Sequence, residues 1–338
     1  MQFSKNWLKE FIDIDLSTQD ICAQLTMAGL EVDGFENINS KITGKDSIIK
    51  LDITPNRGDC FSVLGVAREL AVINNLKLHL PEIPKIHGSF KDSIKIKVCP
   101  EGPSYFGRTL SNISIDAKTQ PLIAERLKLS DQKLIDPVVD ITNYILLELG
   151  QPLHAFDRDT LNGNISVRTA QNKEQITLLD EQKIELDSNC LVISDDRGAI
   201  AFAGIMGGKE TAVSKSTKSI FLESAYFKPS SIRGKARSYG FQTDASLRFE
   251  RGVDFKIQEL ALERASTLLN ETVGGEFSTI ASSSLKNQFP KHKEISLDLE
   301  RSNQILGTNI SKQSAIGYLK GLGLNPKSSK KNTITVVS

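Results

Sequence analysis

Apolar residues recur along the chain with two different spacings, which divide it into helical and strand-like segments. The spacing of three to four residues predicts helices at 17–28, 61–75, 119–128, 137–149 and 254–273. Short alternating or continuous apolar runs predict a strand that starts at 30–32 and further strands at 48–53, 94–98, 105–110, 165–168, 176–179, 183–186, 191–194, 200–203 and 220–222. Three segments without such spacing are expected to be a polar joint, a linker and a loop, at 37–47, 79–89 and 151–157.

This order of elements predicts a multi-domain α+β protein. Residues 1–85 are expected to form a small α/β N-terminal module, and residues 90–285 a central mixed α/β domain. Residues 290–338 are expected to begin a further, mainly helical module. Its last segment, 333–338, is a predicted strand without an obvious partner, so we expect the chain to stop inside this module.

A weak internal repeat links the two ends of the chain. Within 17–30 a serine is followed by leucine, glycine and leucine at offsets of 8, 12 and 13, and the same offsets recur within 311–324. The repeat favours a related small module at each end. Two unrelated helices, each capped by serine and ended by glycine, would produce the same pattern.

Composition narrows the class of protein. Of 338 residues, 39% are hydrophobic and 25% charged, which is typical of a globular protein with real cores. The net charge of +1 means that any affinity for nucleic acid must come from local patches. No apolar run could span a bilayer or serve as a signal peptide, and the four cysteines and four histidines are scattered. These features favour a cytoplasmic protein without a metal site or disulfide framework.

The stretch 199–254 carries the densest candidate chemistry. An apolar run leads into the glycine-rich segment 204–208, and a second apolar run delivers Glu223 at its end. A basic segment follows, with Lys228, Arg233, Lys235, Arg237 and Arg248. These residue types predict a pocket beside a phosphate-rich partner. The plainer alternatives are a solvated or salt-bridged glutamate, an ordinary glycine turn and a solvated basic face.

Several motifs together resemble the β subunit of bacterial phenylalanine–tRNA ligases, and they follow one another in the family's order along nearly the whole chain. They lie at 3–8, 25–34, 54–60, 65–69, 140–144, 149–157, 204–208, 222–223 and 243–254. Members of the family carry an OB-fold where this chain has only the joint near 37–47, and they continue well beyond Ser338. The resemblance therefore implies a fragment or reduced form, without the OB-fold and the C-terminal half.

The resemblance also implies a proofreading site that hydrolyses Tyr-tRNA(Phe). In this interpretation Glu223 accepts the tyrosine hydroxyl, and Gly204 and Gly207 form the pocket wall. Thr243 and Ala245 line the pocket, with Ala245 setting its size, and Thr243 is counted with His154 and Glu223 among the catalytic residues. His154, beside Pro152, orients the hydrolytic water or binds the terminal ribose, whereas a lone histidine in a loop is otherwise a surface residue. No covalent nucleophile is expected.

The remaining expectations concern partners. By resemblance the basic cluster holds phosphates of the tRNA acceptor end, and the chain associates with the α subunit in an α2β2 enzyme. ATP and Mg²⁺ belong to that holoenzyme, with no cofactor in this chain, no DNA and no membrane among its partners. The competing interpretation is a non-catalytic scaffold or RNA-binding fragment of the β subunit.

Overall fold

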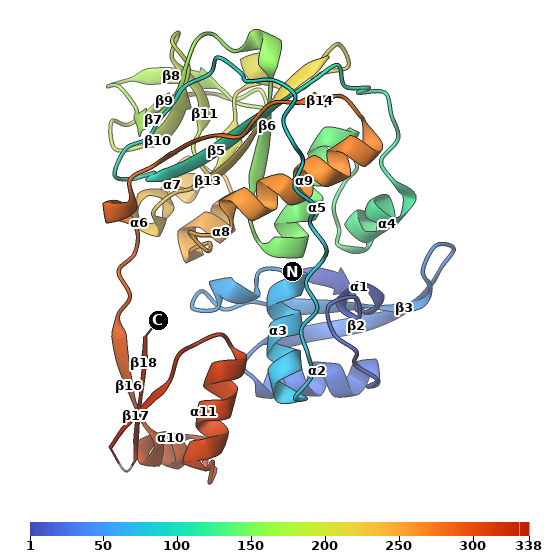
Figure 1. Ribbon diagram of the computed structural model, residues 1–338, viewed down its shortest axis with the longest axis vertical. Coiled ribbons are helices and arrows are strands. Elements are labelled where there is room, and N and C mark those ends of the chain that lie inside the picture. Colours follow the sequence, from blue (N-terminus) through green and yellow to red (C-terminus); the bar gives the residue numbers. More distant parts are fainter. Residues whose placement is uncertain (331, 338) are drawn as a thin grey trace.

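The computed structural model describes residues 1–330 and 332–337, and its helices and sheets are distributed over several units (Figure 1). This arrangement confirms the predicted α+β, multi-domain class. The N-terminal unit consists of β1 (Gln2–Ser4), α1 (Lys5–Leu8), α2 (Thr18–Met27), β2 (Glu31–Ser40), β3 (Gly44–Asp52) and α3 (Val63–Ile73). The C-terminal unit consists of β16 (Glu294–Asp298), α10 (Leu299–Leu306), α11 (Lys312–Gly321), β17 (Lys327–Lys330) and β18 (Thr333–Val337).

The central region lies between these two units along the chain. Its first half contains β4 (Ile96–Lys97), β5 (Ser104–Ser111), α4 (Pro121–Leu129), α5 (Pro137–Leu149), β6 (Leu153–Asp157), β7 (Ile165–Thr169), β8 (Glu174–Thr177) and β9 (Lys183–Leu186). Its second half contains β10 (Leu191–Ser194), β11 (Ala199–Phe202), β12 (Met206–Gly207), β13 (Ser219–Tyr226), α6 (Pro229–Ile232), α7 (Lys235–Ser238), α8 (Asp244–Arg251), α9 (Gln258–Thr272), β14 (Glu276–Phe277) and β15 (Ala281–Ser284).

Two sheets form the centre of the molecule. One has the order β14-β5-β13-β6, with β15 also paired to β5, and the other has the order β12-β11-β10-β7-β4. Successive side chains of β13 point to opposite faces of its sheet. Ile220 and Leu222 belong to the core that contains α5 and α9, whereas Phe221 and Ala225 belong to the core shared with the second sheet. Helices α5 and α9 pack against β6 and β13 from one side (Figure 1). The opposite side of β13 is therefore turned toward the candidate site.

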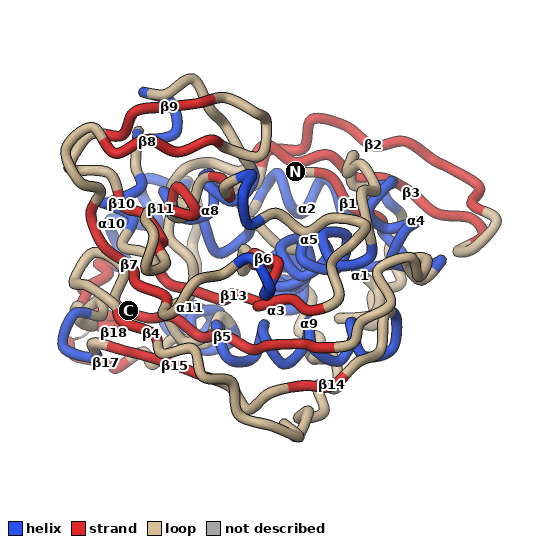
Figure 2. Tube along the Cα trace, turned by 90° about the horizontal axis from the view of Figure 1, so that it is seen from above, coloured by secondary structure: helices blue, strands red, loops and turns tan. Residues whose placement is uncertain are grey.

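The β2–β3 hairpin corrects one prediction. Residues 37–47 were expected to be a polar joint, but Asn37 pairs with Ser47, and the two strands continue to Ser40 and Gly44. The residues of β2 are alternately exposed and half-buried, so this strand lacks the apolar face that the pattern requires. Figure 2 shows this hairpin projecting from the molecule well away from the β8–β9 hairpin.

Two further predictions in the central region are wrong. The expected loop at 151–157 contains β6, which pairs antiparallel with β13 from Leu153 to Asp157. The helix predicted to start at residue 254 begins at Gln258, and the Asp254 carboxylate accepts a hydrogen bond from the Lys256 backbone N–H at 2.9 Å. The pairing partner of β6 is remote in sequence, so the local pattern does not reveal the strand. At Asp254 a local turn competes with the helix and delays its start.

The C-terminal unit is an α/β unit, not the mainly helical module that was predicted. The strand expected to lack a partner, β18, is the central strand of a sheet of order β16-β18-β17. The N-terminal unit has the equivalent chain order and the equivalent strand order, β1-β3-β2. Ser17 and Ser311 cap α2 and α11, and the glycine after each helix, Gly29 or Gly323, has φ +84°. The shared topology favours the repeat over two unrelated capped helices.

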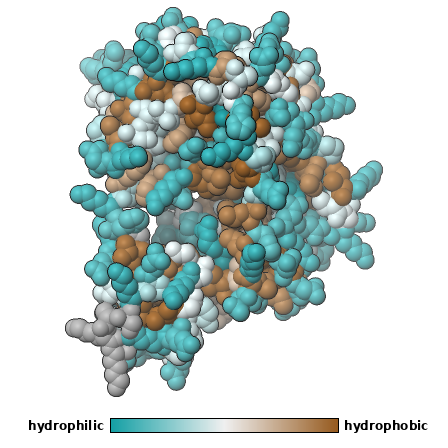
Figure 3. Space-filling model, viewed as in Figure 1, coloured by the Kyte–Doolittle hydropathy of each residue, from teal (hydrophilic) through white to brown (hydrophobic). Residues whose placement is uncertain are grey.

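The largest apolar core crosses the predicted module boundaries. It joins Trp7 and Val66 of the N-terminal unit to Ile141 of α5 and Leu262 of α9. On the face shown in Figure 3, hydrophilic side chains cover most of the surface, and apolar side chains gather near its middle. None of the helices formed by residues 1–330 and 332–337 is long and apolar enough to cross a membrane.

Candidate functional site

A small hollow brings together most of the predicted site residues. Its volume is about 70 Å³, and it opens between β6, β13, the turn after β11 and helix α8. The predicted residues that line it are Pro152, His154, Gly204, Gly207, Glu223 and Ala245. Sequence reasoning missed the other lining residues: Leu153, Ile193, Ala201, Phe202, Ile205, Met206 and Phe249. These are ordinary apolar residues, and only the tertiary structure distinguishes them from the rest of the core.

Strand pairing places the two titratable side chains side by side. Glu223 of β13 lies directly opposite His154 of β6 in the antiparallel register. Residues in directly opposed positions project from the same face of a sheet, with their Cβ atoms about 5 Å apart. The hollow is therefore lined by a carboxyl and an imidazole that are 69 residues apart in sequence but neighbours in the sheet.

The Glu223 carboxyl is buried and has one internal partner. Glu223 is 5% exposed, and its Oε2 accepts a hydrogen bond from the Tyr105 hydroxyl at 3.0 Å. Burial raises the pKa of Glu223 to about 8, and the Tyr105 hydrogen bond opposes part of that rise. At neutral pH the carboxyl is therefore mainly protonated, so it can donate as well as accept a hydrogen bond. This contradicts the plainer interpretation of Glu223 as a solvated or salt-bridged side chain.

The His154 imidazole has the opposite shift. Its side chain is partly exposed, but Nε2 is buried and has no hydrogen-bond partner among the described residues. Burial lowers the pKa of His154 to about 4, so the ring is neutral at neutral pH. Its ring packs edge-on against Phe156, with centroids 4.5 Å apart. A neutral imidazole with a free nitrogen can accept a proton or a hydrogen bond from a ligand.

The glycines of the hollow have separate steric reasons. A Cβ on Gly207 would lie 2.4 Å from Cε1 and 2.6 Å from Nε2 of His154, so the absence of a side chain makes room for the imidazole. Gly204 has φ +70°, a left-handed conformation that favours glycine. A Cβ there would also lie 3.0 Å from the Phe249 ring. Gly207 therefore serves the site directly, whereas Gly204 serves the turn that shapes it.

Thr243 lies beside the hollow and holds helix α8 in place. Its hydroxyl accepts a hydrogen bond from the Ser246 N–H at 3.0 Å and donates one to the Ile205 carbonyl at 2.9 Å. The first bond caps α8, and the second ties the helix start to the turn after β11. Ala245 then projects from the first turn of α8 into the hollow. The prediction that Thr243 lines the pocket is therefore wrong, because its side chain is occupied by these two structural bonds and lies beside the hollow.

The predicted basic cluster is only partly a surface. Arg233 and Arg237 are exposed, whereas Lys228 and Lys235 are half-buried and donate to the amide oxygens of Gln288 and Asn189. Arg248 is a different case, because it is 2% exposed.

The predicted contact of Arg248 with RNA is therefore wrong. Its Nε donates to the Phe61 carbonyl at 3.1 Å, and one terminal nitrogen donates to both the carbonyl and the carboxylate of Asp244 at 2.9 Å. A side chain enclosed in this way is unavailable to a phosphate. Arg248 instead links helix α8 to the N-terminal unit.

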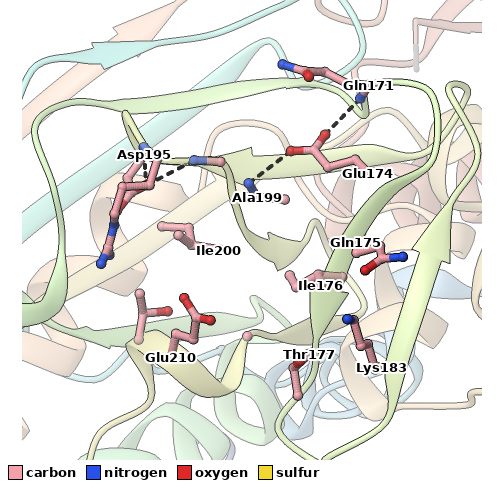
Figure 4. Close-up of a pocket in the computed structure, with 14 residues that line it drawn as sticks. Gln171, Glu174, Gln175, Ile176, Thr177, Lys183, Asp195, Ala199, Ile200 and Glu210 are labelled. Atoms are coloured by element: carbon pink, nitrogen blue, oxygen red, sulfur yellow. Dashed lines mark hydrogen bonds and ion pairs between the residues drawn. The ribbon is translucent and has the colours of Figure 1, made fainter.

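A larger pocket of about 490 Å³ lies on the other side of β11 (Figure 4). Ile200 lines it, whereas the neighbouring Ala201 lines the hollow. Its two most buried acids are satisfied internally: Glu174 accepts from the Ala199 N–H at 3.0 Å and pairs with Arg168, and Asp195 pairs with Arg197 at 2.9 Å. These bonds hold the β8–β9 hairpin and the β10–β11 turn together.

Among residues 1–330 and 332–337, one group of side chains has the spacing of metal ligands. It consists of Asp59, Cys60 and Glu69. The Arg57 guanidinium lies among them, 2.8 Å from Asp59, 2.9 Å from the Cys60 sulfur and in contact with Glu69. Since the Arg57 guanidinium already pairs with both carboxylates and occupies the space between them, the group does not fit a magnesium site. The turn at 54–60 instead forms an internal contact of the N-terminal unit.

Comparison with known proteins agrees with this geometry. A family model described as the B3/4 domain matches residues 101–274, which include both strands of the hollow and helix α8, and it defines the class of the central region. Annotated β subunits of phenylalanine–tRNA ligase are 46% identical in Idiomarina loihiensis, 43% in Pseudoalteromonas translucida and 43% in Acinetobacter baylyi. The chain belongs to the phenylalanine–tRNA ligase β-subunit family.

These matches cover most of this chain but only part of each relative. They cover 83–85% of this chain but 36% of each relative, so the chain spans about a third of the length of the curated relatives it matches. A structural match to a solved N-terminal fragment of the phenylalanyl-tRNA synthetase β subunit from Pyrococcus horikoshii covers 100% of this chain and 92% of that fragment. Its TM-score is 0.45 and its sequence identity 16%.

Proposed function

We propose that this chain acts within a phenylalanine–tRNA ligase and that its hollow proofreads the product by hydrolysing Tyr-tRNA(Phe). The observation that carries the proposal is the pairing of Glu223 with His154 on one face of the β6–β13 ladder, inside a hollow bordered by Gly204 and Gly207. A carboxyl can recognise the tyrosine hydroxyl, and a neutral imidazole can assist attack by water. Both chemistries are needed for selective ester hydrolysis.

Selectivity would follow from the buried carboxyl. The phenol of a tyrosyl group hydrogen-bonds to Glu223, whereas a phenylalanyl group leaves the carboxyl without that partner. An unpaired buried polar group costs about 1–3 kcal/mol, which corresponds to a factor of roughly 5–150 in selectivity. Ala245 and Phe249 of α8 limit the width of the hollow and so help to exclude larger rings.

Hydrolysis would proceed by direct attack of water on the aminoacyl ester. The water oxygen bonds to the ester carbonyl carbon, and the bond from that carbon to the ribose oxygen breaks. His154 accepts the water proton at Nε2, and the departing ribose oxygen takes up a proton, which gives free tyrosine and tRNA. Backbone groups around Gly204 and Gly207, together with the neighbouring hydroxyl of the tRNA ribose, would position the water.

The tRNA and the other subunit complete the proposal. The exposed Arg233 and Arg237, with Lys228 and Lys235, are placed to contact phosphates of the tRNA acceptor end. The α subunit of the enzyme is the expected protein partner, and the activating reaction that uses ATP and Mg²⁺ is expected to take place there. The holoenzyme would work in the cytoplasm.

Release of tyrosine from Tyr-tRNA(Phe) by the chain is the direct test. We expect hydrolysis above the uncatalysed background, with Phe-tRNA(Phe) hydrolysed much more slowly. Glu223→Ala should reduce the preference for tyrosine by about tenfold or more, because the partner of the phenol is lost. If the chain binds tRNA but releases no tyrosine, the non-catalytic scaffold is the better interpretation.

A further inference from the structure

The Glu223 carboxyl has two oxygens in different environments. Oε2 accepts the hydrogen bond from Tyr105 at 3.0 Å, whereas Oε1 accepts no hydrogen bond from the described residues. Tyr105 is fully buried and does not line the hollow, so it approaches the carboxyl from behind. The carboxyl therefore has one oxygen held by the protein and one that remains for a ligand.

The sheet explains how Tyr105 reaches this position. Tyr105 lies on β5 opposite Ala225, and the residue directly opposite Glu223 is Gly107. A Cβ on Gly107 would lie 2.1 Å from the Phe221 ring, so this glycine lets Phe221 lie across β5. Tyr105 then extends along the sheet to its diagonal neighbour, a distance that an aromatic side chain can span. The hydrogen bond is thus fixed by strand register.

We propose that Tyr105 is a specificity-determining positioning residue, which holds Oε2 so that Oε1 of Glu223 faces the hollow as the single position for a substrate hydroxyl. This inference rests on the proposed proofreading function. The group that Tyr105 presents is itself a phenol, the same group that distinguishes tyrosine from phenylalanine. One carboxyl thus lies between an internal phenol and the phenol of the substrate.

The physical reason lies in the freedom of the last carboxyl torsion. The χ3 angle of glutamate has a broad, roughly two-fold profile, so a carboxyl without a fixed partner adopts several orientations. Without the Tyr105 hydroxyl, Oε2 would be a buried acceptor without a donor, and the carboxyl would turn toward other donors or water. Recognition of the substrate hydroxyl would then weaken, while hydrolysis of an ester that lacks this hydroxyl would change little.

The test compares Tyr105→Phe with the unaltered full chain. The variant keeps the ring and removes only the hydroxyl, and kcat/KM is measured for deacylation of Tyr-tRNA(Phe) and of Phe-tRNA(Phe). We expect the ratio of the two values to fall about tenfold, mainly through the tyrosyl substrate. Equal losses for both substrates, or an unchanged ratio, would overturn the proposal.

A matched control is available on the neighbouring strand. Tyr226 of β13 is also buried, at 2% exposure, and packs against Phe255 and Phe289 away from the hollow. Tyr226→Phe removes the same atom and should leave the ratio unchanged. A fall as large as that of Tyr105→Phe would show that loss of any buried tyrosine hydroxyl has this effect, and would also overturn the proposal.

A second readout does not depend on catalysis. The Tyr105 hydrogen bond lowers the pKa of Glu223, so Tyr105→Phe should raise it, and carbon-detected NMR of the labelled glutamate carboxyl can follow this titration. An unchanged titration would show that Tyr105 does not hold the carboxyl. If the unaltered chain releases no tyrosine while the titration shifts as expected, the proofreading function fails, but the Tyr105–Glu223 contact stands.

Discussion

Burial gives the two titratable side chains of the hollow opposite protonation states at neutral pH. The pKa of Glu223 is raised to about 8, so the acid keeps its proton, and the pKa of His154 is lowered to about 4, so the base lacks one. Both groups are therefore neutral, whereas in water at neutral pH a glutamate would be mainly charged and a histidine partly charged. A neutral pair can lie in an apolar hollow at a small desolvation cost and still exchange protons with a substrate.

The pKa of Glu223 predicts a dependence of stability on pH. Because the folded-state pKa lies above the ordinary value of 4.5, the folded chain binds this proton more tightly than the unfolded chain does. The stability contributed by the protonated carboxyl is fully present below pH 4.5 and is lost as pH rises through about 8.

Glu223→Gln removes this titration while preserving size and polarity. Relative to that variant, the free energy of unfolding of the unaltered chain should fall by a few kcal/mol between pH 4.5 and pH 9. Urea unfolding at a series of pH values measures the difference. Parallel curves for the two proteins would show that Glu223 titrates normally.

Replacement of Gly207 by alanine should slow the proposed release of tyrosine with little loss of stability. The φ of Gly207 lies outside the left-handed region, so alanine fits the backbone, but the new Cβ would come within 2.6 Å of Nε2 of His154. Gly207→Ala should displace the imidazole and slow tyrosine release by about a hundredfold. Deacylation kinetics and thermal unfolding measured on the same sample separate the two effects. A comparable loss of activity in the remote variant Gly317→Ala would refute this account, because a Cβ there contacts nothing within 4 Å.

At the scale of elements, helix α8 both borders the hollow and joins two parts of the molecule. Ala245 and Phe249 line the hollow, whereas Arg248 faces the N-terminal unit and Thr243 caps the helix. One short helix thus connects the N-terminal unit directly to the hollow.

Arg248→Met should act on stability and not on RNA binding. The substitution leaves the Phe61 carbonyl without its buried donor, so we expect a loss of about 2–3 kcal/mol in the free energy of unfolding. The slope of log tRNA affinity against log salt concentration should remain unchanged. Arg237→Ala should instead make that slope shallower by about one, the value for one lost phosphate contact. A reduced salt slope in the Arg248 variant would return this residue to the RNA surface.

Local signals account for the elements that the sequence predicts well. Helix α5 spans 137–149 as expected, because Asp136 caps its start, Pro137 occupies its first turn and Gly150 has φ +79° at its end. Each of these devices acts within the helix or next to it. The order of Gly204, Gly207 and Glu223 along the chain, together with the family resemblance, predicts that they share one pocket, and all three line the hollow.

Remote contacts explain what the sequence could not predict. Strand β6 exists because Leu153 to Asp157 pair with β13, and its short alternation alone does not distinguish it from a loop. Tyr105 is one tyrosine among five until strand register brings it to Glu223. The burial of Arg248 depends on Phe61, which is 187 residues away in sequence.

At the scale of the whole molecule, the two end units of equivalent topology contact each other through helices. Helix α11 packs against α3, and a Cβ on Gly321 would lie 2.8 Å from Cγ2 of Val72. The close approach of these helices therefore depends on the absence of a side chain at position 321.

A matched pair of glycines in α11 tests this contact. Gly317→Ala should stabilise the chain by about 0.5–1 kcal/mol, because alanine favours the helix and meets nothing within 4 Å. Gly321→Ala should lack this gain or destabilise the chain, since its methyl group collides with Val72. Chemical denaturation of both variants gives the comparison, and an equal gain at both positions would show that the helices separate at no cost.

The link between α8 and the turn at 53–61 has a consequence for how such chains can be divided. Arg251 donates to the Ile53 carbonyl at 2.7 Å and stacks over the Phe61 ring, next to the Arg248 contact. The matched family segment begins at residue 101, so a cut there would sever both links and split the largest core. The segment that sequence comparison identifies is therefore smaller than the unit that these contacts and the shared core hold together. Transplanting the segment that carries the hollow into another protein would require the N-terminal unit to accompany it.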